Sequence, residues 1–102
     1  MESVLLGTDL KIKVELICEG FDMNDDNFSV DIKWGNEVET YDKSNNAWKT
    51  DSTTGDWYLC LPTTGKKGTV SMVATLWVPD EDFGDVGRKE VVKQDLFTIN
   101  KV

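Results

Sequence analysis

Apolar and polar residues alternate with a period of two along most of this 102-residue chain, and this alternation constrains its fold more than any other feature. In residues 10–18 and 28–34, every second residue is apolar and most residues between are charged or polar. Successive side chains of a β-strand point to opposite faces, so each segment predicts a strand with one buried face. No segment has a sustained apolar period of 3.6 residues, so we expect no helix longer than one turn.

Five further segments continue the alternation and are separated by residues that favour turns. Gly35-Asn36 predicts a tight turn that reverses the chain into a hairpin. Residues 79–87, which contain proline, glycine and several acids, predict a loop. The further expected strands are residues 37–41, 47–50, 56–61, 69–78 and 90–99.

About seven short strands with turns between them predict an all-β fold, a two-layer antiparallel sandwich of immunoglobulin-like type. A small β-barrel is the alternative. A chain of 102 residues has room for one domain, residues 1–102. Within it, residues 1–9 contain the apolar run Val4, Leu5 and Leu6, which either pairs at a sheet edge or forms an arm that docks on another subunit.

Acidic residues outnumber lysine and arginine by 19 to 11, giving a formal net charge of −8. The pairs Lys66-Lys67 and Arg88-Lys89 are isolated, so we expect no nucleic-acid partner. The start of the chain lacks the features of a signal peptide and no apolar run approaches the length of a bilayer span, so we expect a cytoplasmic origin and no membrane contact. Cys18 and Cys60 are then expected to be reduced thiols.

The chain contains no histidine, which removes the commonest general base and the usual partner of a serine or cysteine nucleophile. We therefore expect no enzyme, no catalytic residue and no cofactor. Two acidic loops, residues 22–26 and 80–85, raise the alternative of calcium, which binds oxygen ligands. Neither has the register of a helix-flanked calcium loop, so we favour turns whose Asp and Asn side chains accept hydrogen bonds from backbone amides, and no metal.

The four tryptophans divide into two groups by their phase. Trp34 and Trp57 are in phase with apolar neighbours and are expected in the core. Trp48 and Trp77 are out of phase or lie in weakly patterned segments, so we expect them to be exposed. Exposed tryptophans favour a protein partner surface. The alternative is a carbohydrate-binding module with a glycan stacked on the indole faces.

Residues 78–91 resemble a Pro-Asp-x-Asp-Phe-x-Asp-Gly-x-Arg-x-Glu pattern found in small proteins of Bacteroides phages and prophages, including crAss-like phages. The resemblance extends to residues 10–18 followed by Gly20-Phe21-Asp22, and to residues 57–64 followed by a glycine, so it covers most of the chain. One departure is Val86-Gly87, which stands where the pattern has glycine before a variable residue.

This resemblance implies a non-catalytic structural protein of the virion, a head-fibre or capsid-decoration subunit assembled in the host cytoplasm. Its partners would be capsid or fibre proteins and further copies of itself, with a dimer favoured. Arg88 is expected to pair with Asp80 or Asp85 and to hold the loop as a surface feature. The candidate partner-binding residues are Val4, Leu5, Leu6, Trp48, Trp77, Asp80, Asp82, Phe83, Asp85 and Arg88.

Overall fold

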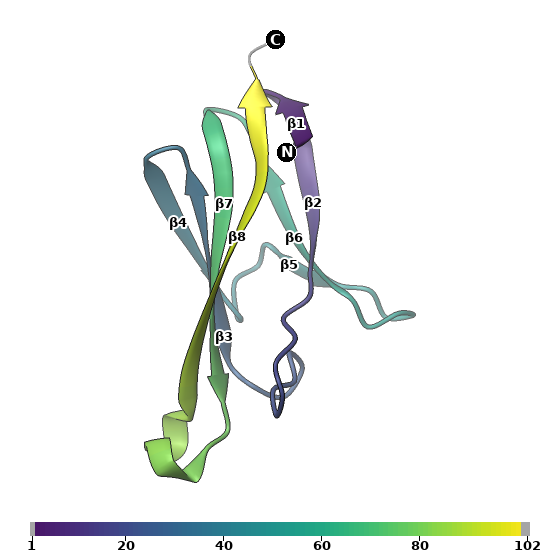
Figure 1. Cartoon of the computed structure of the whole chain (residues 1–102). Coiled ribbons are helices and arrows are strands. Elements are labelled where there is room, and N and C mark those ends of the chain that lie inside the picture. The colour runs from purple at the N-terminus through teal and green to yellow at the C-terminus, as the bar shows by residue number, and fades with distance from the viewer. Residues whose placement is uncertain (1, 101–102) are drawn as a thin grey trace.

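The computed structural model describes the backbone of residues 2–100 and the side chains of residues 3–99. This part of the chain is mostly β-structure, with 56% strand and 6% helix, and it contains no helix long and apolar enough to cross a bilayer. Its elements (Figure 1) are β1 (Glu2–Leu5), β2 (Asp9–Val14), β3 (Phe28–Trp34), β4 (Glu37–Asp42), β5 (Trp48–Thr50), β6 (Trp57–Pro62), β7 (Gly68–Val78), the 3-10 segment η1 (Glu81–Val86) and β8 (Arg88–Asn100).

These strands form two sheets of unequal width, which confirms the predicted all-β fold. The large sheet has five strands in the order β1-β8-β7-β3-β4, and the small sheet has three in the order β2-β6-β5. Every pairing is antiparallel except that of β1 with β8, which is parallel, so the prediction of a wholly antiparallel fold is wrong at this edge. Because β1 and β8 lie at opposite ends of the sequence, no hairpin turn fixes their relative direction.

The buried faces of the central strands follow the alternation in the sequence. In β3, Val30 and Ile32 are fully buried and Trp34 is 2% exposed. In β7, the alternate residues Val70, Met72, Ala74, Leu76 and Val78 are buried. Leu59 and Leu61 of β6 face them from the small sheet and belong to the same cluster of buried side chains. One hydrophobic core therefore joins the two layers.

The strand predicted for residues 10–18 is shorter in the structure. β2 ends at Val14, whose partner Trp57 is the first residue of β6. Beyond this pair none of the described strands remains for residues 15–18 to join, and the chain closes a turn in which the Phe21 amide donates to the Cys18 carbonyl at 3.0 Å. Ile17 consequently lies 87% exposed although it is apolar.

Three aromatic rings from the two layers pack against one another. Phe28 of β3 is fully buried and meets Trp48 and Trp57 edge to face, each with 5.3 Å between ring centroids. The Trp48 indole donates to the Asp42 carbonyl at 2.9 Å. Trp48 is only 7% exposed, so the prediction that it lies on the surface is wrong. β5 has three residues, too few to reveal in the sequence which of its faces is buried.

Residues 2–8 are held within the fold of the chain itself. β1 pairs with β8, and Val4 and Leu6 pack against the core, whereas Leu5 is 56% exposed. The fully buried Thr63 hydroxyl accepts from the Gly7 amide and donates to the Thr8 carbonyl, both at 2.8 Å. Of the two alternatives for this segment, pairing at a sheet edge is therefore the one observed.

Replacing the ring that contacts both tryptophans tests this account of the core. We expect Phe28→Ala to lower the free energy of unfolding by about 3–5 kcal/mol, because it leaves a cavity between the layers. Urea denaturation followed by tryptophan fluorescence measures the change. The matched control is Phe83→Ala, since Phe83 is 56% exposed, and its effect should stay within about 0.5 kcal/mol. Equal losses in both variants would contradict the proposed role of Phe28.

Candidate functional site

The connection between β7 and β8 gathers more of the predicted partner-binding residues than any other segment. Asp80 caps η1, because its side chain accepts from the Asp82 amide at 3.0 Å and its carbonyl accepts from the Phe83 amide at 3.0 Å. Gly84, with φ of 76°, divides η1 into two short turns. An aspartate cap of this kind is the hydrogen-bonding arrangement predicted for the acidic loops.

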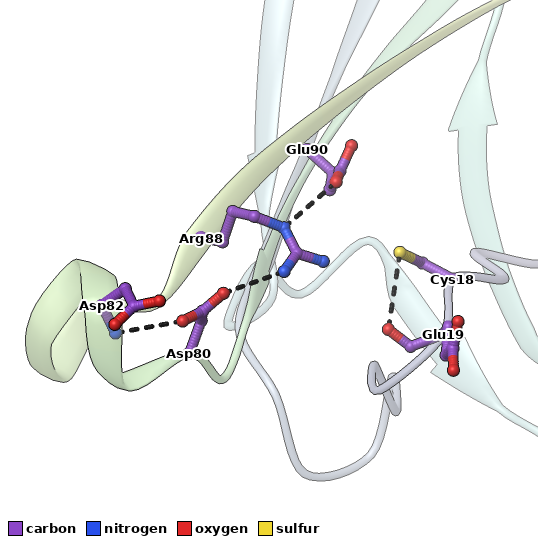
Figure 2. A network of polar contacts seen from close by, with 6 residues as sticks. All are labelled: Cys18, Glu19, Asp80, Asp82, Arg88 and Glu90. Carbon is purple, nitrogen blue, oxygen red and sulfur yellow. Dashed lines mark hydrogen bonds and ion pairs between the residues drawn. The ribbon is translucent and has the colours of Figure 1, made fainter.

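Arg88 ties the two ends of this connection together, as Figure 2 shows. Its Nη1 donates to Asp80 Oδ2 at 2.9 Å, and its Nε donates to Glu90 Oε1 at 3.2 Å. The hydrogen bond to Asp80, followed by that to Glu90, raises the pKa of Arg88 above its ordinary value. Of the two partners predicted for Arg88, Asp80 is confirmed. The loop is therefore fixed by ionic hydrogen bonds at its base.

Gly87 closes the connection at the point where the sequence departs from the phage pattern. Its φ is 86°, and a Cβ atom added there would lie 2.4 Å from the Val78 carbonyl oxygen. Only glycine combines this backbone conformation with so close an approach to the end of β7. The displaced glycine is thus required by the local geometry.

Apolar side chains are concentrated around this connection. Of the seven exposed large hydrophobic residues in the described chain, four fall within residues 83–92: Phe83, Val86, Val91 and Val92. Val91 and Val92 were missed by the sequence analysis, although two adjacent valines put an apolar residue on each face of a strand. Val91 and Val92, together with Asp80, Asp82, Phe83, Asp85, Val86 and Arg88, define a region that we call the η1–β8 surface.

The remaining predicted residues lie elsewhere. Trp77 is half-buried near the end of β7, beside Lys89 of β8. Val4, Leu5 and Leu6 lie at the opposite end of β8, where β1 pairs with residues 97–100. Trp48 is in the core and is removed from the candidate surface.

The structure brings no two exposed tryptophans side by side within the described residues. Trp34 and Trp48 are buried, and the half-buried Trp57 and Trp77 belong to different sheets. The Trp57 indole also donates to Asn24 Oδ1 at 3.2 Å. A flat platform for a glycan is therefore not formed by these side chains.

The acidic loop at residues 22–26 is occupied by a cation of the chain itself. Lys43 Nζ donates to the carbonyls of Asn24 and Asp26 at 2.9 and 2.8 Å. Asp22 and Asp26 accept from backbone amides at 2.8 Å, as predicted for a turn. No group of three or more Asp, Glu, Cys or His residues arranged to hold a metal occurs in the described residues. Cys18 and Cys60 are free thiols.

A second polar cluster lies along β4, at the other edge of the large sheet. Lys66 forms an ion pair with Glu39 and lies over the Trp34 ring, 5.4 Å from its centroid. Tyr41 donates to Glu39 at 3.3 Å. Burial, followed by the nearby Glu39 charge, raises the pKa of Tyr41 to about 12. A neighbouring cavity of about 450 Å³ is lined by Trp34, the Gly35–Glu37 turn and the loop at residues 65–68.

Comparisons of this chain with family models, with curated proteins and with solved structures find no match.

Alanine substitutions at two glycines separate the effect of backbone conformation from that of close contact. Gly87→Ala should lower the free energy of unfolding by about 2 kcal/mol or more, because it adds a clash with Val78 to the cost of a positive φ. Gly84→Ala is the control, since Gly84 has φ of 76° and open space around it. Chemical denaturation measures both. If Gly84→Ala lowered the free energy of unfolding as much as Gly87→Ala does, the close contact with Val78 would not be the cause.

The raised pKa of Tyr41 predicts that its phenol ionises only at high pH. In a Tyr58→Phe background, tyrosinate absorbance should report Tyr41 ionising with a pKa of about 12. Glu39→Gln should lower this value, because it removes the nearby charge. Since the folded state holds the phenolic proton more tightly than the unfolded state, stability should fall as the pH rises from 10 to 12. A midpoint at the ordinary value in the folded protein would contradict the arrangement.

Proposed function

We propose that this chain is a non-catalytic structural subunit that acts through protein–protein contacts, with an immunoglobulin-like domain. The observation that carries the proposal is the concentration of exposed apolar side chains on the η1–β8 surface, where four of the seven in the described chain lie. Exposed apolar side chains concentrated in one segment, here on both faces of β8 and on η1, favour a contact with another protein.

The construction of the loop supports a binding role. A partner surface loses less conformational entropy on association when its loops are already ordered. The Asp80 cap, the Arg88 hydrogen bonds and the close packing of Gly87 on Val78 restrict the conformations open to η1. Phe83 and Val86 are then presented on a fixed backbone, 56% and 68% exposed.

The resemblance to phage proteins indicates the kind of assembly in which this binding would occur. It favours a head-fibre or capsid-decoration subunit of a virion, assembled in the host cytoplasm, with capsid or fibre proteins and other copies of the chain as partners. The segment carrying the resemblance, residues 78–91, coincides with most of the η1–β8 surface. A partner contact explains why several of its exposed loop residues follow a pattern that the fold alone does not require.

Incorporation into particles tests the proposal. The wild-type chain should co-purify with phage particles from cells that produce it, and crosslinking mass spectrometry should join residues 83–93 to a capsid or fibre protein. The double variant Phe83→Asp/Val86→Asp should lose incorporation by about tenfold or more, because it places charges in an apolar contact. Ile17→Asp is the control, since Ile17 is apolar and exposed outside this surface.

Two results would each contradict a different part of the proposal. If the wild-type chain stays out of purified particles, the structural role is wrong. If it enters particles and the double variant enters equally well, the η1–β8 surface is not the contact. Circular dichroism of each variant establishes that its β-fold is retained, so that loss of incorporation is read as loss of contact.

A further inference from the structure

The first half of β8 is an open sheet edge. β8 pairs with β7 on one side along its length, but on the other side β1 covers only residues 97–100. No described strand pairs with residues 88–96 on that outer side. Figure 1 shows this half of β8 and η1 extending beyond the end of the small sheet. A strand edge of this length presents unpaired amides and carbonyls to another chain.

Both faces of this half-strand are also uncovered. The register with β7 places Val92 opposite Ala74, on the face that carries the core, and Val91 opposite Thr75, on the outer face. Val92 is nevertheless 52% exposed and Val91 59% exposed. An inward-facing valine is left in solvent because the three strands of the small sheet do not reach it.

Two charged residues of this strand, Lys89 and Asp95, can pair with each other across two copies of the chain. Lys89, Lys93 and Asp95 share the outer face, opposite Trp77, Val73 and Ser71 of β7. Lys89 and Asp95 lie symmetrically about Val92 in the sequence, three residues to each side. Neither forms an ion pair with another described residue, since the ion pairs at this end join Arg88 to Asp80 and Glu90.

We propose that two copies of this chain associate through β8, antiparallel and about a two-fold axis at Val92. Val92 then lies opposite Val92 of the partner subunit, and Lys89 lies opposite Asp95 of the partner subunit on both sides of the axis. The two large sheets become one continuous sheet. The inference rests on the proposed function and names the partner and the contact for that role.

Symmetry, charge and the length of the free edge select this register. Edge pairing about a two-fold axis keeps the faces of the two sheets aligned only if some residue lies directly opposite its own copy in the partner subunit. The axis is then named by that residue. An axis at Val91 would set Lys89 opposite Lys93 twice, and an axis at Lys93 would set two lysines directly opposite each other. Like charges directly opposite destabilise a strand pair, whereas opposite charges stabilise it. An axis at Gln94 would also set Lys93 opposite Asp95, but only residues 92–96 could then pair, because β1 covers residues 97–100.

The other exposed edges are less suited to self-association. β4 contains Glu37, Glu39 and Asp42 and no basic residue, so it offers no opposite charge to a second copy of itself. β5 is only three residues long. In β2, the antiparallel register that sets Asp9 opposite Lys13 of a second copy also sets Lys11 opposite Lys11 of that copy, so like charges meet at its centre.

Charge reversal tests both the interface and its register. Sedimentation velocity should find the wild-type chain at about twice the 11.5 kDa mass of one copy. Lys89→Asp and Asp95→Lys should each weaken the dimer about tenfold, because each sets like charges opposite at two places. The double variant Lys89→Asp/Asp95→Lys restores opposite charges and should return the affinity to within about threefold of wild type. Lys33→Asp, on another strand of the same sheet, is the control and should leave the dimer unchanged.

Val92→Lys provides a second test, since it places two positive charges on the axis at a position that is already half exposed. It should yield a folded monomer. A wild-type monomer at the highest concentration that stays in solution would overturn the inference, as would a dimer that survives Val92→Lys or a double variant weaker than both singles.

Particle incorporation separates the failure of this inference from that of the proposed function. If the chain is monomeric and still enters particles, the β8 dimer is wrong and the structural role stands, whatever other strand then occupies the edge. If the wild-type chain dimerises through β8 but is absent from particles, the dimer stands and the structural role is wrong.

Discussion

The unequal width of the two sheets is the constraint on which the surface of this protein depends. A sheet of three strands cannot cover a sheet of five. The small sheet therefore buries the inner faces of β3 and β7 and leaves the inner face of the first half of β8 exposed. Within the core, Phe28 of the large sheet contacts Trp48 and Trp57 of the small sheet edge to face. These rings stabilise the contact between the two layers, and the mismatch in width leaves an uncovered, partly apolar margin along β8.

This margin is useful only if it is rigid, and the β7–β8 connection supplies the rigidity. β7 and β8 form a long ladder that continues past the core, and Arg88 closes its end through Asp80 and Glu90. Gly87 allows the chain to leave η1 directly against the Val78 carbonyl. Because the exposed valines sit on a ladder fixed at both ends, an approaching chain meets an ordered strand rather than a flexible loop.

The sequence predicts the bounds of most strands to within two residues, because the alternation that defines them is local. β3 has the predicted bounds, β7 begins one residue earlier than predicted, and the edge strand β4 ends one residue later. The segment 10–18 alternates equally well, yet it stops at Val14 because β6 provides no further partner. The burial of Trp48 and the parallel direction of β1 both depend on contacts with residues outside their own strands. Local periodicity contains no information about either property.

The same reasoning explains why the candidate surface was found only in part. Asp80, Phe83 and Arg88 were indicated by a loop pattern, but the adjacent Val91 and Val92 read as an ordinary buried strand until the missing cover above them is seen. Their flanking charges have two roles. Lysines on an open edge oppose indiscriminate strand pairing, and in the proposed dimer their arrangement about Val92 would set opposite charges against each other. The same charged residues would therefore both disfavour unspecific pairing at this edge and favour the proposed register.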